Sequence, residues 1–229
     1  MNAIDPTLER EYNNRAMVPE HPAIFERWRH QSTALRTIAD SSLDLAYGAH
    51  ERHRLDVFRA PHAVGTVIFI HGGYWRSLDK SDCSFLAGPL MDLGLSVAAF
   101  NYRLCPAVAI SDIVDDCRTA CAWLATHGET HGLNLSRVAL AGHSAGGHLV
   151  SSLFAGDRGP AASGMNIVGG TAVSGVFDLQ PLLHCSMNAD LHLDAPAARA
   201  LSPIHLPPAL DVPLQLSVGA DESAAFRRQ

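Results

Sequence analysis

The sequence has little that would suit a membrane or a nucleic acid as partner. Its longest apolar runs, such as TVIFI and LSVAAF, are far shorter than the roughly 20 residues of a membrane helix. The opening stretch MNAIDPTLEREYNNRAM carries charges of both signs, which is not typical of a signal peptide. The net charge is -6, and no run of lysine or arginine is present. We therefore expect a cytoplasmic protein that binds neither nucleic acid nor membrane.

The sequence also lacks the residue patterns of a disulfide scaffold or a metal enzyme. Its five cysteines are odd in number and include no C-x-x-C pair, which favours free thiols in a reducing compartment. No H-E-x-x-H motif occurs, and His127 and His131, four residues apart, lie at a helix end marked by glycine. We expect no metal site and no cofactor. The length of 229 residues favours one large domain.

The chain changes its pattern twice. Residues 1–40 are polar with a helical tendency, so we expect a helical arm or cap laid over the rest. The segments LDLAYG and HRLDVFRA alternate apolar and polar residues, which indicates an antiparallel hairpin. From residue 66, nearly continuous apolar runs alternate with helical stretches, as parallel strands covered on both faces do. The runs are TVIFIHGG, LSVAAFNYRL, RVALAGHS, IVGGTAVSGVF and PLQLSVGAD.

The clearest helix is predicted from Ile110 to His127. Its apolar residues recur at spacings of three and four and so form one face, while the opposite side is expected to carry Asp112, Asp115, Asp116 and Arg118. Alternating strands and helices predict an α/β fold with a mostly parallel central sheet and helices on both faces.

Gly142-His143-Ser144-Ala145-Gly146 matches the pattern G-x-S-x-G. An apolar strand ends at Ala141 and a helix can begin at Ala145, which is the context that a nucleophilic serine needs on a sharp strand-to-helix turn. The serine hydroxyl is a weak nucleophile unless a base takes its proton. The alternative is a tight turn with an incidental serine.

The segment HGGYW, His71 to Trp75, follows another strand. Esterases carry such a glycine loop to stabilise the oxyanion of the tetrahedral intermediate. We assign the oxyanion hole to the N–H groups of Gly73 or Tyr74 and of Ala145. Tyr74 and Trp75 are candidates for stacking on an aromatic substrate; the alternative is a glycine turn with Trp75 in the core.

A catalytic acid is expected at the end of a later strand. Asp221 follows the apolar run in PLQLSVGADES and is our choice. Glu222 lies one residue farther from the strand. Asp178, in SGVFDL, also follows a strand and is the rival acid.

Together these motifs resemble the α/β-hydrolase superfamily, and more closely its kynurenine formamidase-like (arylformamidase-like) branch and bacterial esterases. The similar segments are EYNNR, HGGYW, SLDKSD, NYRL, GHSAGGHL, SGVFDLQPL, NADL and GADES-x-x-F-x-R-Q. The resemblance implies hydrolysis of an aryl formamide such as N-formylkynurenine, or of small esters, without a cofactor. It also implies that Ser144 is the nucleophile and Asp221 the acid.

The family pattern requires a histidine about thirty residues beyond the acid, yet none of the 13 histidines follows Asp221 and the sequence stops at Gln229. We therefore expect residues 41–229 to form a hydrolase domain whose last strand and helix are missing. Without the imidazole base this form is expected to be almost inert. The other histidines considered as base are weaker candidates: His71, His143, His148, His184, His192 and His205.

Two further readings stay open. A carboxylesterase would share the same machinery but have a different pocket. A non-catalytic homologue would keep the pocket and bind an aromatic small molecule, with His143 as a possible substrate contact. The sequence leaves a homodimer open as well.

Overall fold

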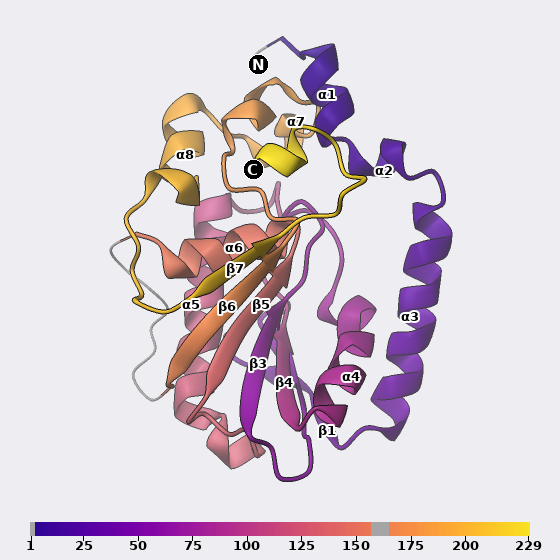
Figure 1. Ribbon diagram of the computed structural model, residues 1–229, viewed down its shortest axis with the longest axis vertical. Helices are drawn as coiled ribbons and strands as arrows, with labels where there is room; N and C mark the ends of the chain where they lie inside the picture. The colour runs from indigo at the N-terminus through magenta and orange to yellow at the C-terminus, as the bar shows by residue number, and fades with distance from the viewer. Residues whose placement is uncertain (1–2, 157–164) are drawn as a thin grey trace.

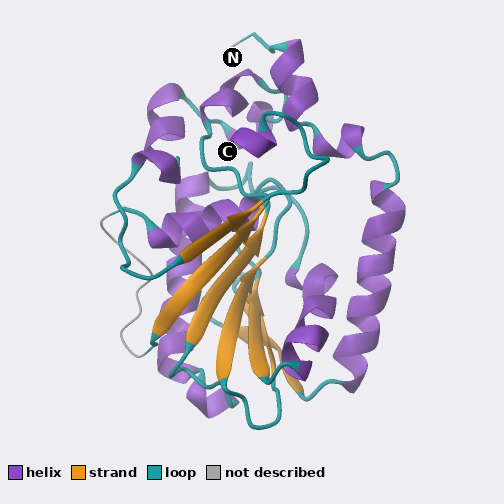
Figure 2. Ribbon diagram, in the orientation of Figure 1, coloured by secondary structure: helices purple, strands orange, loops and turns teal. Residues whose placement is uncertain are grey.

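The computed structural model describes residues 3–156 and 165–229, which form one sheet of seven strands with helices on both faces (Figures 1 and 2). The strand order is β1-β2-β4-β3-β5-β6-β7. β2 pairs antiparallel with β1 and β4, and the remaining pairs are parallel. The strands are β1 (Ser41–Ala46), β2 (Arg54–Phe58), β3 (Gly65–Ile70), β4 (Leu95–Phe100), β5 (Val138–His143), β6 (Ile167–Val173) and β7 (Leu214–Ser217). The predicted α/β fold, hairpin and five later strands are confirmed.

The two faces of the sheet carry separate apolar layers because side chains alternate along each strand. In β3, Ile68 and Ile70 point to the same layer as helices α5 (Ile110–His127) and α6 (Ala145–Phe154). Phe69 points to the opposite layer, with the 3-10 helix η1 (Lys80–Leu86) and α4 (Ala87–Asp92). All six residues of β3 are buried, as expected for a strand covered on both sides. None of the helices within the described ranges is long and apolar enough to cross a membrane.

Helix α5 begins at Ile110 and ends at His127, as the apolar spacing predicts. The prediction is wrong for one of the residues expected on its outer side. Asp116 is buried, because its carboxylate accepts hydrogen bonds from the Arg103 backbone N–H (2.9 Å) and guanidinium (2.8 Å). Periodicity could not show this, because a buried carboxylate is tolerated only where the fold brings a partner from another segment.

The N-terminal helices run along the outside of the molecule and over the carboxyl end of the strands (Figure 1). They are α1 (Pro6–Tyr12), α2 (Asn14–Met17) and α3 (His21–Ile38). Asp5 caps α1 by accepting hydrogen bonds from the first-turn N–H groups of Thr7 and Leu8. The chain between β6 and β7 forms short helices at the same end of the sheet, namely η3 (Gln180–His184), α7 (Asn188–Leu191), α8 (Ala195–Ala200) and η4 (Pro203–His205).

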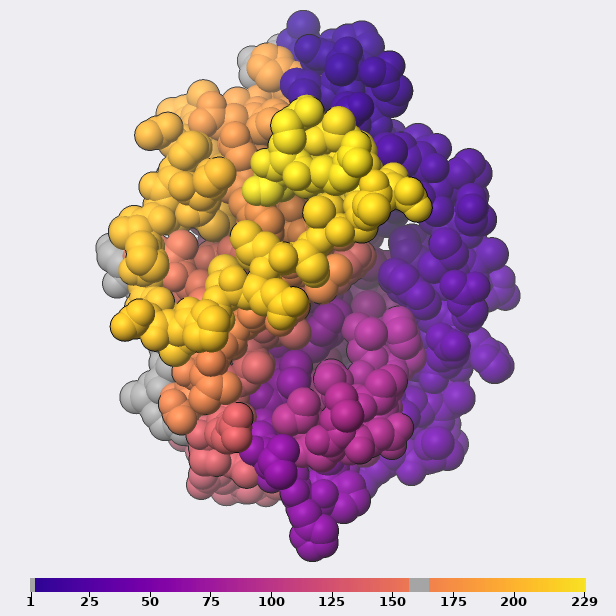
Figure 3. Space-filling model, viewed as in Figure 1, coloured from indigo at the N-terminus to yellow at the C-terminus, as the bar shows by residue number. Residues whose placement is uncertain are grey.

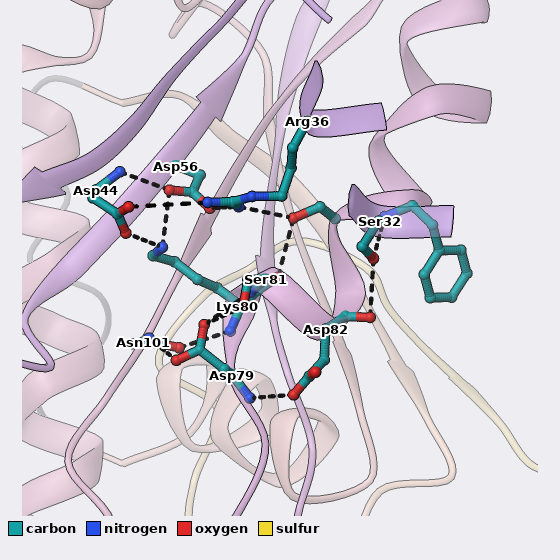
Figure 4. Close-up of polar contacts among 11 residues, drawn as sticks. Ser32, Arg36, Asp44, Asp56, Asp79, Lys80, Ser81, Asp82 and Asn101 are labelled. Atoms are coloured by element: carbon teal, nitrogen blue, oxygen red, sulfur yellow. Dashed lines mark hydrogen bonds and ion pairs between the residues drawn. The ribbon is translucent and has the colours of Figure 1, made fainter. Parts of the chain in front are cut away.

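A buried group of charged side chains joins α3, the β1–β2 hairpin and η1 (Figure 4). Lys80 is only 2% exposed, and its ammonium lies 2.9 Å from Asp56 and 2.6 Å from Asp44. Asp56 is fully buried and also accepts a hydrogen bond from Arg36. Because each buried charge depends on an opposite charge supplied by a different element, these contacts fix how the elements pack.

Asp56→Asn should lower the free energy of unfolding by about 3–5 kcal/mol, since it leaves Lys80 and Arg36 without their shared buried carboxylate. Urea denaturation measures the loss. The matched control is Asp92→Asn at an exposed site on α4, which should stay within about 0.5 kcal/mol of the unchanged chain. Equal effects of the two substitutions would contradict the structural role of the charged group.

Strand β7 pairs only with β6 among the described strands, so it forms one edge of the sheet. Its side chain Leu216 is 54% exposed, and Val218 just beyond it is 43% exposed. Exposed apolar edge strands can pair with other chains and so aggregate.

Leu216→Lys should slow aggregation, because a charge on an exposed edge strand opposes pairing with another chain. Light scattering of concentrated samples at low and high salt measures the effect. Leu93→Lys, at another exposed leucine far from the edge strand, is the control. An equal gain from both variants would mean that net charge, and not the edge, controls aggregation.

Candidate active site

Ser144 occupies a strained turn between the end of β5 at His143 and the start of α6 at Ala145. Its φ of +56° and ψ of -120° lie where L residues rarely occur. Such strain persists only where the surroundings fix it, and it is concentrated at functional sites. The predicted strand, turn and helix around this serine are confirmed.

The two glycines of the motif are required by close backbone contacts. A Cβ on Gly142 would lie 2.2 Å from the Gly146 carbonyl oxygen, and one on Gly146 would lie 2.0 Å from the Ile70 carbonyl oxygen. Both distances are far below van der Waals contact, so any side chain would push α6 away from β5 and β3. The glycines thereby allow the turn that places Ser144 at the edge of a cavity.

The HGGYW loop lies directly against this turn. A Cβ on Gly72 would lie 3.1 Å from the Ser144 Cβ. Three consecutive residues, Gly73, Tyr74 and Trp75, have positive φ values of 107°, 50° and 57°. Within the described residues, no acceptor takes a hydrogen bond from the N–H groups of Gly73, Tyr74 or Ala145. These N–H groups therefore keep their hydrogen-bonding capacity, as the oxyanion-hole prediction requires.

Trp75 is fully buried, so the structure adopts the core alternative and not stacking on a substrate. Its indole N–H donates to His148 Nδ1 (3.2 Å), and His148 Nε2 donates to the Leu201 carbonyl (2.8 Å). Burial lowers the pKa of His148 from 6.5 to about 4. His148 is therefore a neutral imidazole with both nitrogens engaged, which holds Trp75 in place.

His71 has a similar supporting role at the start of the loop. It stacks on Tyr102 at 4.3 Å between ring centroids, and its Nδ1 donates to the Gly72 carbonyl (2.8 Å). Burial lowers the pKa of His71 to about 4. The Tyr102 hydroxyl donates to the carbonyls of His71 (2.9 Å) and Gly72 (3.1 Å). Buried polar groups thus fix the loop from behind.

The two rival acids have different surroundings. Asp221 is exposed and lines a cavity together with Ser144 and His143. Its neighbour Glu222 accepts hydrogen bonds from the Gly219 N–H (2.9 Å) and from the Ser174 hydroxyl. Asp178 instead accepts from the Gln180 N–H (2.9 Å) two residues further on, as an Asp side chain does in a local turn.

Of the remaining histidines, only His143 lines the cavities beside Ser144. Desolvation by neighbouring protein atoms lowers its pKa, while the Glu222 carboxylate acts in the opposite direction. His184 lies against the Ala3 carbonyl (3.3 Å), and His205 against the Gln180 side chain (3.4 Å), both exposed.

A second cavity beside Ser144 is formed largely by N-terminal residues, which sequence reasoning missed apart from the EYNNR similarity. Phe25 and Trp28 of α3 and Tyr74 supply aromatic surface. Polar and charged groups come from Glu9, Asn13, Asn14, Arg15, Arg76, Ser77 and Ser186. The N-terminal segment and the C-terminal stretch meet over this end of the sheet, indigo and yellow in Figure 3. The Ala225 N–H donates to Glu11 there (2.8 Å).

Acid should destabilise the fold through His71 and His148. Their folded pKa values of about 4 lie below the ordinary 6.5, so the unfolded chain binds protons first as the pH falls. Their contribution is complete above pH 6.5 and is lost toward pH 4, by at most about 3 kcal/mol for each histidine. Urea denaturation at pH 7.5 and 4.5 measures the difference.

His148→Gln should reduce this difference, since glutamine can replace both hydrogen bonds without titrating. His62→Asn, at an exposed residue whose φ of 53° asparagine tolerates, should leave it unchanged. A pH dependence that His148→Gln leaves intact would show that other groups cause it.

Comparison with known proteins places this chain in a family. Residues 55–160 match the family model BD-FAE. A kynurenine formamidase from Salmo salar is 31% identical over 202 residues, which span 85% of this chain and 67% of that protein. The crystal structure of a candidate thioesterase from Silicibacter sp. is 36% identical, with a TM-score of 0.88 over 96% of this chain and 83% of that chain.

Esterase B from Lactobacillus rhamnosis shares the fold, with 22% identity and a TM-score of 0.66 over 88% of this chain and 74% of that chain. The identity and coverage of the Salmo salar relative show that the chain belongs to the kynurenine formamidase family of α/β-hydrolases.

Proposed function

We propose that this chain hydrolyses an aryl formamide through an acyl-enzyme on Ser144. The observation that carries the proposal is the strained Ser144 turn, packed against Gly72 and surrounded by unpaired backbone N–H groups. Ser144 Oγ attacks the formyl carbon, and the N–H groups of Gly73, Tyr74 and Ala145 stabilise the oxyanion. The C–N bond then breaks, the amine leaves with a proton, and water hydrolyses the formyl-serine ester to release formate.

N-formylkynurenine is the proposed substrate type. The name of the Salmo salar relative supports a formamide. The cavity beside Ser144 supports an aromatic leaving group, because Phe25, Trp28 and Tyr74 line it.

The proposed acid is Asp221, which shares a cavity with Ser144 and would orient an imidazole base. The buried histidines His71 and His148 do not suit the base, since their low pKa values and hydrogen bonds commit them to the loop. His143 precedes Ser144 and lines the cavity, but within residues 3–156 and 165–229 no carboxylate forms a hydrogen bond or ion pair with its ring. We therefore propose that the deprotonation of Ser144 by a base is the step that limits the rate of hydrolysis by this chain.

Imidazole added to the solution should raise the rate of N-formylkynurenine hydrolysis at least tenfold, because it supplies the base that deprotonates Ser144. Absorbance of the released kynurenine measures the rate. Ser144→Ala should abolish the rate increase that imidazole causes in the enzyme. The rate that remains in this variant measures hydrolysis by free imidazole alone. Ser136→Ala, at an exposed serine in another loop, should keep it.

Three other outcomes are decisive. Turnover without imidazole that His143→Ala abolishes would make His143 the base. Imidazole-dependent turnover that Ser144→Ala retains would reject the serine mechanism. Stable binding of N-formylkynurenine with no acylation of Ser144 in any buffer would favour a non-catalytic homologue.

A carboxylesterase is the second candidate, since the matched fold of esterase B shows that this architecture accommodates ester hydrolysis. Short p-nitrophenyl esters, assayed beside N-formylkynurenine under the same conditions, separate the two. A higher kcat/KM for the esters would favour the esterase.

A further inference from the structure

Two neighbouring residues of the EYNNR segment line the cavity with Ser144 but take no part in the proposed chemistry. Asn14 and Arg15 belong to the short helix α2. Arg15 lines the aromatic cavity, and Asn14 lines both that cavity and the one that contains Asp221. Both residues therefore line the space beside Ser144.

Arg15 is an exposed cation with spare hydrogen-bonding capacity. Its guanidinium donates to the Ser77 hydroxyl (2.9 Å) and lies 5.8 Å from the centre of the Phe25 ring. Within residues 3–156 and 165–229, no carboxylate forms an ion pair with it. The other arginine of the cavity, Arg76, is already paired with Asp190 at 2.5 Å.

The Arg15 contact also connects it to the oxyanion loop. Ser77 receives the Arg15 hydrogen bond and itself donates to the Gly73 carbonyl (2.9 Å). The guanidinium is therefore held at a fixed place relative to Ser144. Its planar group of donors matches the geometry of a carboxylate.

Asn14 provides an unsatisfied acceptor. Its side-chain carbonyl oxygen is buried and has no hydrogen-bond partner among the described residues. A buried polar atom without a partner is unfavourable, so a ligand that supplies an N–H group gains affinity by satisfying it. The nearby Glu9 carboxylate is already engaged by the N–H (2.7 Å) and hydroxyl (2.8 Å) of Ser186.

We propose that Asn14 and Arg15 form a specificity subsite for amides that carry a carboxylate on the amine side. Arg15 pairs with the carboxylate, and the Asn14 carbonyl accepts the hydrogen bond of the amide N–H. This inference rests on the proposed function, because it takes Ser144 as the reacting centre. The subsite binds anionic amides more tightly than neutral amides, which lack the carboxylate, and more tightly than esters, which lack the N–H.

Binding is measured by calorimetry in the Ser144→Ala chain, so that no chemistry occurs. The ligands are 3-acetamidobenzoate, its ester counterpart 3-acetoxybenzoate, and acetanilide, which has no carboxylate. We expect 3-acetamidobenzoate to bind about tenfold more tightly than acetanilide, since a charge-assisted hydrogen bond contributes about that factor or more. The preference should fall as salt is raised.

Arg15→Ala should weaken 3-acetamidobenzoate about tenfold and leave acetanilide unchanged, and Arg15→Lys should restore part of the preference. Arg10→Ala removes an exposed arginine of α1 that does not line this cavity and should change neither affinity. The parent chain should bind 3-acetamidobenzoate severalfold more tightly than 3-acetoxybenzoate, and Asn14→Ala should reduce this preference. Circular dichroism confirms that each variant is folded.

The proposal is overturned if Arg15→Ala binds 3-acetamidobenzoate as tightly as the parent, if Arg10→Ala loses as much, or if none of the ligands binds. These outcomes are independent of the serine chemistry. Carboxylate-dependent binding in a chain that never acylates at Ser144 would retain the subsite and reject the mechanism. Acylation at Ser144 without carboxylate-dependent binding would do the reverse.

Discussion

The site depends on a backbone contact that is too close to leave room for any side chain. Helix α6 starts so close to β3 and β5 that the Gly146 Cα lies against the Ile70 carbonyl, where a Cβ would come within 2.0 Å. This approach forces Ser144 into a conformation with positive φ. The strain is sustained because α6 is buried on all sides, from Ala145 to Phe154, and cannot relax outward. The packing of the core therefore holds the half-buried serine in this conformation.

The HGGYW loop beside the serine is held in place by buried polar groups from other segments of the chain. Tyr102, which follows β4, binds two of its carbonyls, and His148 on α6 binds Trp75. Farther along, the Lys80 backbone N–H donates to the Asn101 side chain (2.7 Å). The Lys80 ammonium enters the charged group with Asp56. Segments from three parts of the chain thus hold one loop in place, because each buried polar atom requires a hydrogen-bond partner at a defined position.

The N-terminal segment completes the pocket by covering this end of the sheet. Tyr12 shows how it is attached, because its carbonyl accepts from the Tyr74 hydroxyl (2.6 Å) and its hydroxyl from the Gln229 side chain (2.7 Å). Residues more than sixty positions apart therefore form one wall. Ser144 and the proposed oxyanion donors lie in the turn after β5 and in the loop after β3. Residues of α1 to α3 line the cavity beside them, and we propose that these residues distinguish one substrate from another.

The sequence by itself determined the local features of this protein. Continuous apolar runs predict β3 to β7, spacing of three and four predicts α5, and G-x-S-x-G with HGGYW identifies the turn and the loop, because each depends on neighbours within a few residues. The tertiary structure alone decided that Asp116 and Trp75 are buried and that His148 accepts the Trp75 hydrogen bond. It also decided that Asn14 and Arg15 line a cavity together with Ser144. Those outcomes depend on partners distant in the chain, and a single sequence does not contain the distances between them.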